Sequence, residues 1–132
     1  MTGFPLKIVT PDGLEFDGIA EQLIVRTITG DMGIMAKHAD CVAPLGMGEA
    51  TVVIDGQRRR AACIGGMVSV INGAVNLVPT TFEWAEEIDV ARAEASGKRA
   101  QAILNNKNAS DTEIKLAKAR MKRALVRMNV RK

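Results

Sequence analysis

Residues 50–78, ATVVIDGQRRRAACIGGMVSVINGAVNLV, decide the fold class of this chain. In this stretch, β-branched and small apolar residues alternate with polar ones, and the pairs Asp55-Gly56, Gly65-Gly66 and Asn72-Gly73 separate the runs. A period of two is typical of half-buried strands, and Asp-Gly and Asn-Gly pairs are strong hairpin signals. We therefore predict consecutive strands joined as hairpins at residues 50–54, 58–64, 67–71 and 74–78.

The sequence before this stretch continues the pattern, with strands predicted at residues 6–10, 14–19 and 22–29. The turn Pro11-Asp12-Gly13 joins the first two strands, because proline presets φ and glycine accepts a positive φ. Hairpins that follow one another without an intervening helix predict an antiparallel sandwich or a barrel-like body.

The composition changes after Pro79, and from Ile88 onward Ala, Lys, Arg, Glu, Leu and Met dominate. These residues favour helices. Asp89 is a suitable N-cap for a first helix that extends to about Asn105. The run Ser110-Asp111-Thr112-Glu113 has the arrangement of a capping box and predicts a second helix to about Asn129.

The two predicted helices carry apolar stripes that fit an antiparallel hairpin with a short loop. On the second helix the stripe consists of Ile114, Ala117, Met121, Ala124, Leu125 and Met128. On the first helix it consists of Ala93, Ala100, Ile103 and Leu104. Because alanine buries little apolar surface, we expect the helix pair to be marginally stable by itself and able to separate.

The net charge of +3 hides an asymmetry along the chain. Residues 1–89 hold 6 Lys/Arg and 12 Asp/Glu, a net charge of −6, whereas residues 90–132 hold 12 Lys/Arg and 3 Asp/Glu, a net charge of +9. No apolar run is long enough to cross a bilayer, and Cys41 and Cys63 show no metal or redox spacing. We expect a cytosolic protein with free thiols.

The sequence contains no recognisable catalytic motif. A phosphate-binding Gly-x-x-x-x-Gly-Lys-Ser/Thr run is absent, and the carboxylates are dispersed. His38 lies three residues before Cys41, a spacing that a thiol nucleophile and its base can have, but no third residue orients the pair. One His and two scattered Cys do not make a convincing metal site. We predict no catalytic residue and no metal.

The basic tail has several interpretations. Its cations surround the apolar stripe of the second helix and are Lys115, Lys118, Lys122, Arg123, Arg127, Arg131 and Lys132. They fit a solvated helix face, an acidic protein partner, an anionic membrane surface or nucleic acid. Binding of nucleic acid is the weaker interpretation, because the tail has no aromatic side chain for base stacking. A free-standing β-domain whose basic helical tail binds nucleic acid is nevertheless the alternative function.

Four landmarks of the sequence together resemble one family. They are Thr10-Pro11-Asp12-Gly13, Gly30-Asp31-Met32-Gly33-Ile34 with His38 shortly after, Ile64-Gly65-Gly66-Met67-Val68-Ser69-Val70, and Ile88-Asp89-Val90-Ala91-Arg92-Ala93. In order and spacing they are similar to the epsilon subunits of bacterial rotary ATP synthases, and they cover essentially the whole chain. Met67 departs from the aromatic residue that the family commonly has there, but it keeps the apolar bulk.

The resemblance implies an antiparallel ten-stranded β-sandwich at residues 1–87 and a regulatory two-helix hairpin at residues 88–132. It implies a non-catalytic rotor subunit of a proton- or sodium-driven ATP synthase, peripheral to the cytoplasmic face of the cell membrane. The sandwich would bind the gamma subunit and the c-ring, with Asp31 and His38 as contacts. The compact hairpin would permit ATP hydrolysis, and the extended hairpin would block it, with Lys118 and Lys122 meeting acidic segments of the beta subunits.

The resemblance also implies ATP as a regulatory ligand, although no cofactor is required. Some members of the family bind ATP through an Ile/Leu-Asp-x-x-Arg-Ala motif, which residues 88–93 retain. The implied site residues are Glu83, Asp89, Arg92, Arg99, Arg123 and Arg127. Arg92 and Arg99 share one helical face, as do Arg123 and Arg127, and a triphosphate would offset their repulsion. The alternative is that Asp89 is only an N-cap and that the arginines face solvent or partners.

Overall fold

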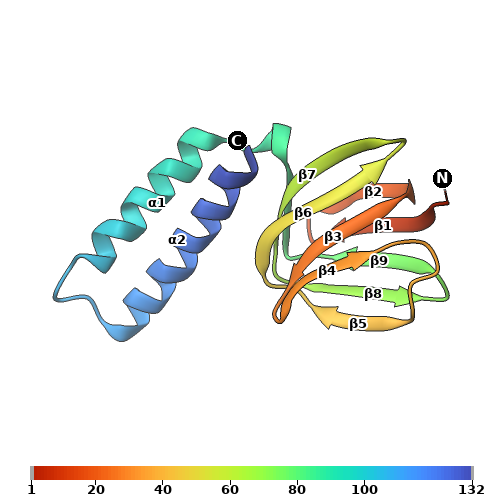
Figure 1. Cartoon of the computed structure of the whole chain (residues 1–132). Helices are drawn as coiled ribbons and strands as arrows, with labels where there is room; N and C mark the ends of the chain where they lie inside the picture. The colour runs from red at the N-terminus through yellow and green to blue at the C-terminus, as the bar shows by residue number, and fades with distance from the viewer. Residues whose placement is uncertain (1, 132) are drawn as a thin grey trace. The chain divides into compact units, whose positions relative to one another are not determined.

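The computed structural model describes residues 2–131 of the chain. The chain divides between Ala85 and Glu86 into two compact units, which we call the sandwich unit and the helical unit. Figure 1 shows the strands of the first unit and the paired helices of the second. Within residues 2–131, no helix is both long enough and apolar enough to cross a membrane.

The described residues of the sandwich unit form ten strands in two sheets. These strands are β1 (Phe4–Thr10), β2 (Gly13–Ala20), β3 (Gln22–Thr27), β4 (Gly30–Ile34), β5 (Cys41–Pro44), β6 (Met47–Ile54), β7 (Gln57–Ile64), β8 (Met67–Ile71), β9 (Ala74–Val78) and β10 (Thr81–Trp84). One sheet has the order β2-β1-β9-β8-β5 and the other has the order β10-β7-β6-β3-β4. The predicted fold class, a ten-stranded β-sandwich followed by two helices, is confirmed.

The hairpins that decided the prediction are present. Asp55 and Gly56 have φ values of 50° and 75°, and Asn72 and Gly73 have values of 50° and 79°. Two successive residues with positive φ are what a tight hairpin turn requires. One pairing differs from the antiparallel pattern, because β1 and β9 run parallel to each other. Hairpin signals predict pairing only between strands that are adjacent in the sequence, so they could not predict this contact between distant strands.

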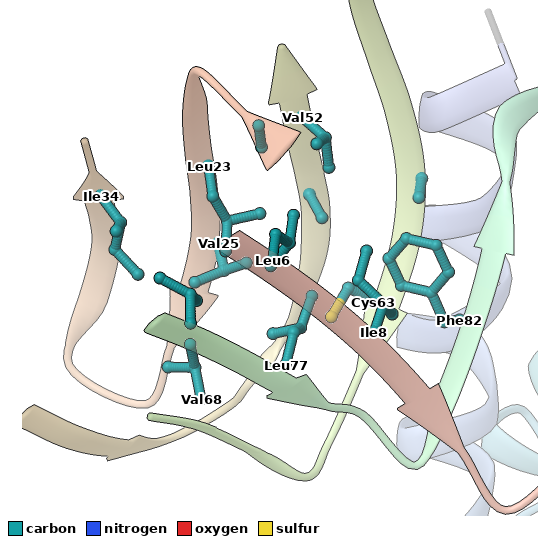
Figure 2. Close-up of a cluster of buried hydrophobic side chains, with 14 of the residues drawn as sticks. Leu6, Ile8, Leu23, Val25, Ile34, Val52, Cys63, Val68, Leu77 and Phe82 are labelled. Atoms are coloured by element: carbon teal, nitrogen blue, oxygen red, sulfur yellow. The ribbon is translucent and has the colours of Figure 1, made fainter. Parts of the chain in front are cut away.

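The core of the sandwich lies between the two sheets. Every second residue of β1 is buried, including Leu6 and Ile8, and these side chains meet Leu23 and Val52 of the facing sheet. Figure 2 shows the labelled side chains of both sheets pointing toward one another. At roughly 25 cal/mol per Å² of apolar surface removed from water, this cluster is the main source of stability of the unit.

The sequence pattern did not predict three short strands. β4, β5 and β10 have five, four and four residues, and β4 contains glycines while β5 ends in a proline. In strands of this length, apolar and polar residues alternate too few times for the pattern to be recognised. Glycine and proline also indicate turns rather than strands.

The helical unit consists of α1 (Val90–Leu104) and α2 (Asp111–Arg131), preceded by the short 3₁₀ helix η1 (Ala85–Glu87). The side chain of Asp89 accepts a hydrogen bond of 3.0 Å from the backbone N–H of Arg92, so the predicted N-cap is present. At α2, the Ser110 hydroxyl accepts from the N–H of Glu113 at 3.1 Å, and the Glu113 carboxylate accepts from the N–H of Ser110 at 3.2 Å. The predicted capping box is confirmed.

The seam between α1 and α2 differs from the predicted stripes at two positions. Apart from Val130 near the end of α2, the buried residues of the two helices are small, namely Ala93, Gly97 and Ala100 on α1 and Ala117 and Ala124 on α2. Leu125 was predicted to lie on the stripe, but its side chain is 48% exposed, because it lies at the edge of the stripe, beyond Met121 and Met128. Gly97 is a seam residue that the apolar pattern did not identify.

Candidate functional site

Asp31 and His38 lie on different segments of the sandwich unit. Asp31 lies at the beginning of β4, and its carboxylate pairs with Nε of Arg26 on β3 at 2.8 Å. Both side chains are more than half exposed, and exposed ion pairs contribute about 0–1 kcal/mol. His38 follows the end of β4, and its Nδ1 lies 2.8 Å from the carbonyl oxygen of Ala39. Along the chain, Asp31 is therefore within β4 and His38 is in the segment that follows it.

The sandwich unit has exposed apolar residues that the sequence analysis missed. Met67 of β8 lies opposite Pro44 of β5 on one side and Val78 of β9 on the other. The side chains of Met67 and Val78 are 49% and 48% exposed. Val42 and Ile71 are also exposed. Strand alternation places Val68 and Val70 in the core instead. The nearly continuous apolar run of residues 67–71 could have indicated that β8 has apolar residues on both faces of its sheet. Exposed apolar patches commonly bind partners.

The predicted ATP-binding residues belong to both units. Glu83 lies on β10 and pairs with Ala62 of β7 in the sandwich unit. Asp89 and the arginines belong to the helical unit, where Arg92 and Arg99 are exposed on α1 and Arg123 and Arg127 are half-buried on α2. Each arginine pair shares a side of its helix, as its spacing of seven or four residues predicts.

A groove lies between α1 and α2, on a different part of the hairpin. It has a volume of about 240 Å³ and is lined by Glu94, Gly97, Lys98, Gln101, Met121 and Met128. None of the predicted arginines lines it. Gly97, Met121 and Met128 contribute apolar surface to this lining.

Lys118 and Lys122 are exposed on α2 at a spacing of four residues, so they lie on one face of the helix. Leu125, which follows Lys122 by three residues, is exposed on the same side. The basic and apolar character of this face suits an acidic amphipathic partner. Among residues 2–131, no group of three or more His, Cys, Asp or Glu is arranged to hold a metal ion.

Comparison with known protein families gives a match for each unit. Residues 3–85 match the family "ATP synthase, Delta/Epsilon chain, beta-sandwich domain". Residues 86–132 match "ATP synthase, Delta/Epsilon chain, long alpha-helix domain". Together the two matches define the class of the protein, a two-part delta/epsilon chain of ATP synthase.

Curated relatives narrow this class. The ATP synthase epsilon chain of Ruminococcus albus is 41% identical over 131 residues, which cover 98% of this chain and 97% of the relative. The epsilon chain of Bacillus velezensis is 41% identical over 125 residues, 95% of this chain and 94% of the relative. The chain belongs to the ATP synthase epsilon chain family. This confirms the predicted resemblance and the non-catalytic assignment, and the nucleic-acid-binding alternative gains no support.

Solved structures share the fold. A chain of the Euglena gracilis mitochondrial ATP synthase matches with a TM-score of 0.81 and 20% identity, covering 92% of this chain and 77% of that one. A chain from the central stalk and c-ring of the Tetrahymena thermophila mitochondrial ATP synthase matches with a TM-score of 0.65 and 14% identity, covering 97% and 96%.

Proposed function

We propose that this chain is the epsilon subunit of the central stalk of a rotary ATP synthase, where it couples rotation of the c-ring to the catalytic head. The observation that carries the proposal is the family match over both units, at residues 3–85 and 86–132. The sandwich unit binds the gamma subunit and the c-ring. The exposed apolar side chains of Met67 and Val78, together with Asp31 and His38, support this role because they offer apolar and polar contacts.

The helical unit restrains ATP hydrolysis. In its compact form it permits rotation in the hydrolytic direction, and in its extended form it blocks that rotation. The alanine-rich seam supports this proposal, because separating α1 from α2 exposes little apolar surface. Lys118 and Lys122 meet acidic segments of the beta subunits when α2 is extended, since their charges are exposed on one face.

ATP is the proposed regulatory ligand of the helical unit. Its phosphates would bind Arg92, Arg99, Arg123 and Arg127, because guanidinium groups make charge-assisted hydrogen bonds to phosphate oxygens. This donor set fits a triphosphate, and ATP binding would favour the compact hairpin by reducing the repulsion between the arginines. Asp89 keeps the arginine-bearing end of α1 helical through its N-cap, and Glu83 would accept a hydrogen bond from the adenine amino group.

The complex holds the subunit at the cytoplasmic face of the cell membrane, to which the chain is peripheral. A pull-down from native membranes, with the chain as bait, tests the assembly role. We expect recovery of the gamma and beta subunits and of the c-ring. Recovery of nucleic acid without these subunits would contradict the proposal and favour the basic tail as a nucleic-acid-binding element.

Calorimetric titration of the purified chain with ATP tests the ligand. We expect binding at or below millimolar ATP, a loss of affinity of at least tenfold in Arg92→Ala, and a change in the fluorescence of Trp84, the single tryptophan. Arg120→Ala is the matched control, since Arg120 is an exposed arginine of α2 outside the proposed set. Absence of binding in the millimolar range would leave the arginines as contacts for beta and gamma.

A further inference from the structure

Gly97 is an unusual residue for its place in the helical unit. It lies near the middle of α1, eight residues into a helix of 15, and it is buried in the seam against α2. Its neighbours along the seam, Ala93 and Ala100, are alanines. Glycine in a helix interior is less favourable than alanine by a factor of about five in the helix equilibrium, because it loses more backbone freedom on folding.

The seam does not require glycine at this position. An ideal Cβ on Gly97 would lie 3.5 Å from Cβ of Ala124, 3.9 Å from Sδ of Met121 and 4.0 Å from Cε of Met128. All three distances are ordinary van der Waals contacts, so a methyl group fits without displacing a neighbour. The backbone of Gly97 is helical, so no positive φ explains the glycine either.

The missing methyl group also shapes the groove between the helices. Gly97, Met121 and Met128 contribute to its lining, and the groove has a volume of about 240 Å³. A seam side chain at position 97 would contact both methionines, whereas glycine leaves that surface open to solvent. Gly97 therefore lowers the stability of the helix pair in two ways. It makes α1 itself less favourable, and it removes a side-chain contact between α1 and α2.

We infer that Gly97 sets the stability of the α1–α2 pair and keeps it low enough for the two helices to separate. The regulatory meaning of this inference rests on the proposed function, in which separation of the helices is the inhibitory step. The structural part does not depend on it, because it concerns the hairpin alone. Gly97→Ala stabilises the compact hairpin and shifts the equilibrium between paired and separated helices toward the paired form.

Amide hydrogen exchange of the full chain tests the structural part. In Gly97→Ala we expect exchange of the central α1 amides to slow by fivefold or more. The matched control is Ala95→Gly, at an exposed position of the same helix, which makes the opposite change in helix preference without touching the seam. It should accelerate exchange by about fivefold. Unchanged or faster exchange in Gly97→Ala would overturn the inference, because it would show that the seam needs the glycine.

ATP hydrolysis by the reconstituted complex tests the regulatory part. With Gly97→Ala in place of the natural chain, we expect hydrolysis to be inhibited severalfold less, since the compact form is favoured. If exchange slows but inhibition is unchanged, the role of Gly97 in the seam stands and the proposed inhibitory function fails. If inhibition weakens while exchange is unchanged, the inference about Gly97 fails and the proposed function stands.

Discussion

Burial separates the two cysteines of the chain into different chemical environments. Cys63 lies on β7 with 3% of its surface exposed, and desolvation raises the pKa of its thiol to about 12 from the ordinary value of 9.0. Cys41 lies on β5 and is only partly buried. The sequence predicted two free thiols, and both are free, but only the packing of the sheets reveals that the thiol of Cys63 is held in its neutral form.

The buried thiol makes stability depend on pH in the alkaline range. Since the folded chain disfavours the thiolate, Cys63 contributes its full stabilisation below about pH 9, and this contribution is lost as pH rises toward 12. The loss is at most about 1.4 kcal/mol per pH unit. We predict that the difference in unfolding free energy between the natural chain and Cys63→Ala shrinks between pH 9 and pH 11. Cys41→Ala, which leaves Cys63 in place, should keep the natural pH dependence, and a parallel pair of curves for Cys63→Ala would contradict the prediction.

Arg59 forms a contact that no sequence pattern indicated. Its guanidinium carbon lies 3.7 Å from the centroid of the Trp84 ring, which also packs edge-on against Phe82 at 4.9 Å. The sequence has three consecutive arginines at residues 58–60. This run could not indicate that one of them covers an aromatic ring, because β7 and β10 are distant in the sequence.

We predict that Arg59→Ala lowers the free energy of unfolding by about 0.5–2 kcal/mol, since a cation over an indole face contributes this much. Chemical denaturation followed by Trp84 fluorescence measures the change. Arg58→Ala is the control, because Arg58 is the exposed neighbour on the same strand, and it should have little effect. Equal losses in both variants would show that the ring contact is not the cause.

At the scale of elements, local signals predicted the structure well where they were dense. The Asp-Gly and Asn-Gly hairpins, the N-cap Asp89 and the capping box at Ser110 are all present, since each depends on residues within four positions of one another. The short strands β4, β5 and β10 and the parallel pairing of β1 with β9 were not predicted. Short strands lack periodicity, and a pairing between distant strands depends on tertiary packing.

The capping box of α2 should contribute to the stability of the helical unit. Ser110→Ala removes the acceptor of the 3.1 Å bond from the N–H of Glu113, so we expect a loss of about 1 kcal/mol in the stability of α2. Thermal unfolding followed by circular dichroism at 222 nm measures it. Ser110→Asp keeps a cap acceptor and should remain close to the natural chain. If the alanine and aspartate variants unfold alike, the cap does not stabilise the helix.

At the scale of the whole molecule, the sequence predicted the division between a β-rich part and a basic helical part, because composition and charge change together after Pro79. It did not predict how the candidate site residues are arranged. Asp31 lies on β4 and pairs with Arg26, His38 follows the end of β4, and the exposed apolar residues around Met67 were not predicted. These features depend on which face of a sheet each residue occupies and on what covers it.

The sandwich unit should fold without the helical unit. Its hydrophobic cluster consists of residues between Phe4 and Trp84, so deleting residues 88–132 removes none of it. We predict that residues 1–87 unfold cooperatively and keep the near-ultraviolet circular dichroism of Trp84. A truncated chain without a cooperative transition would show that the helical unit is needed to complete the sandwich.

The most direct test of the central claim is ATP hydrolysis by an ATP synthase reconstituted with either the full chain or residues 1–87, with retention on the gamma subunit measured in parallel. The account predicts that both forms bind gamma and that hydrolysis is severalfold faster with residues 1–87, because the restraint lies in the helical unit. Equal hydrolysis rates with both forms bound, or failure of the full chain to bind gamma, would contradict it.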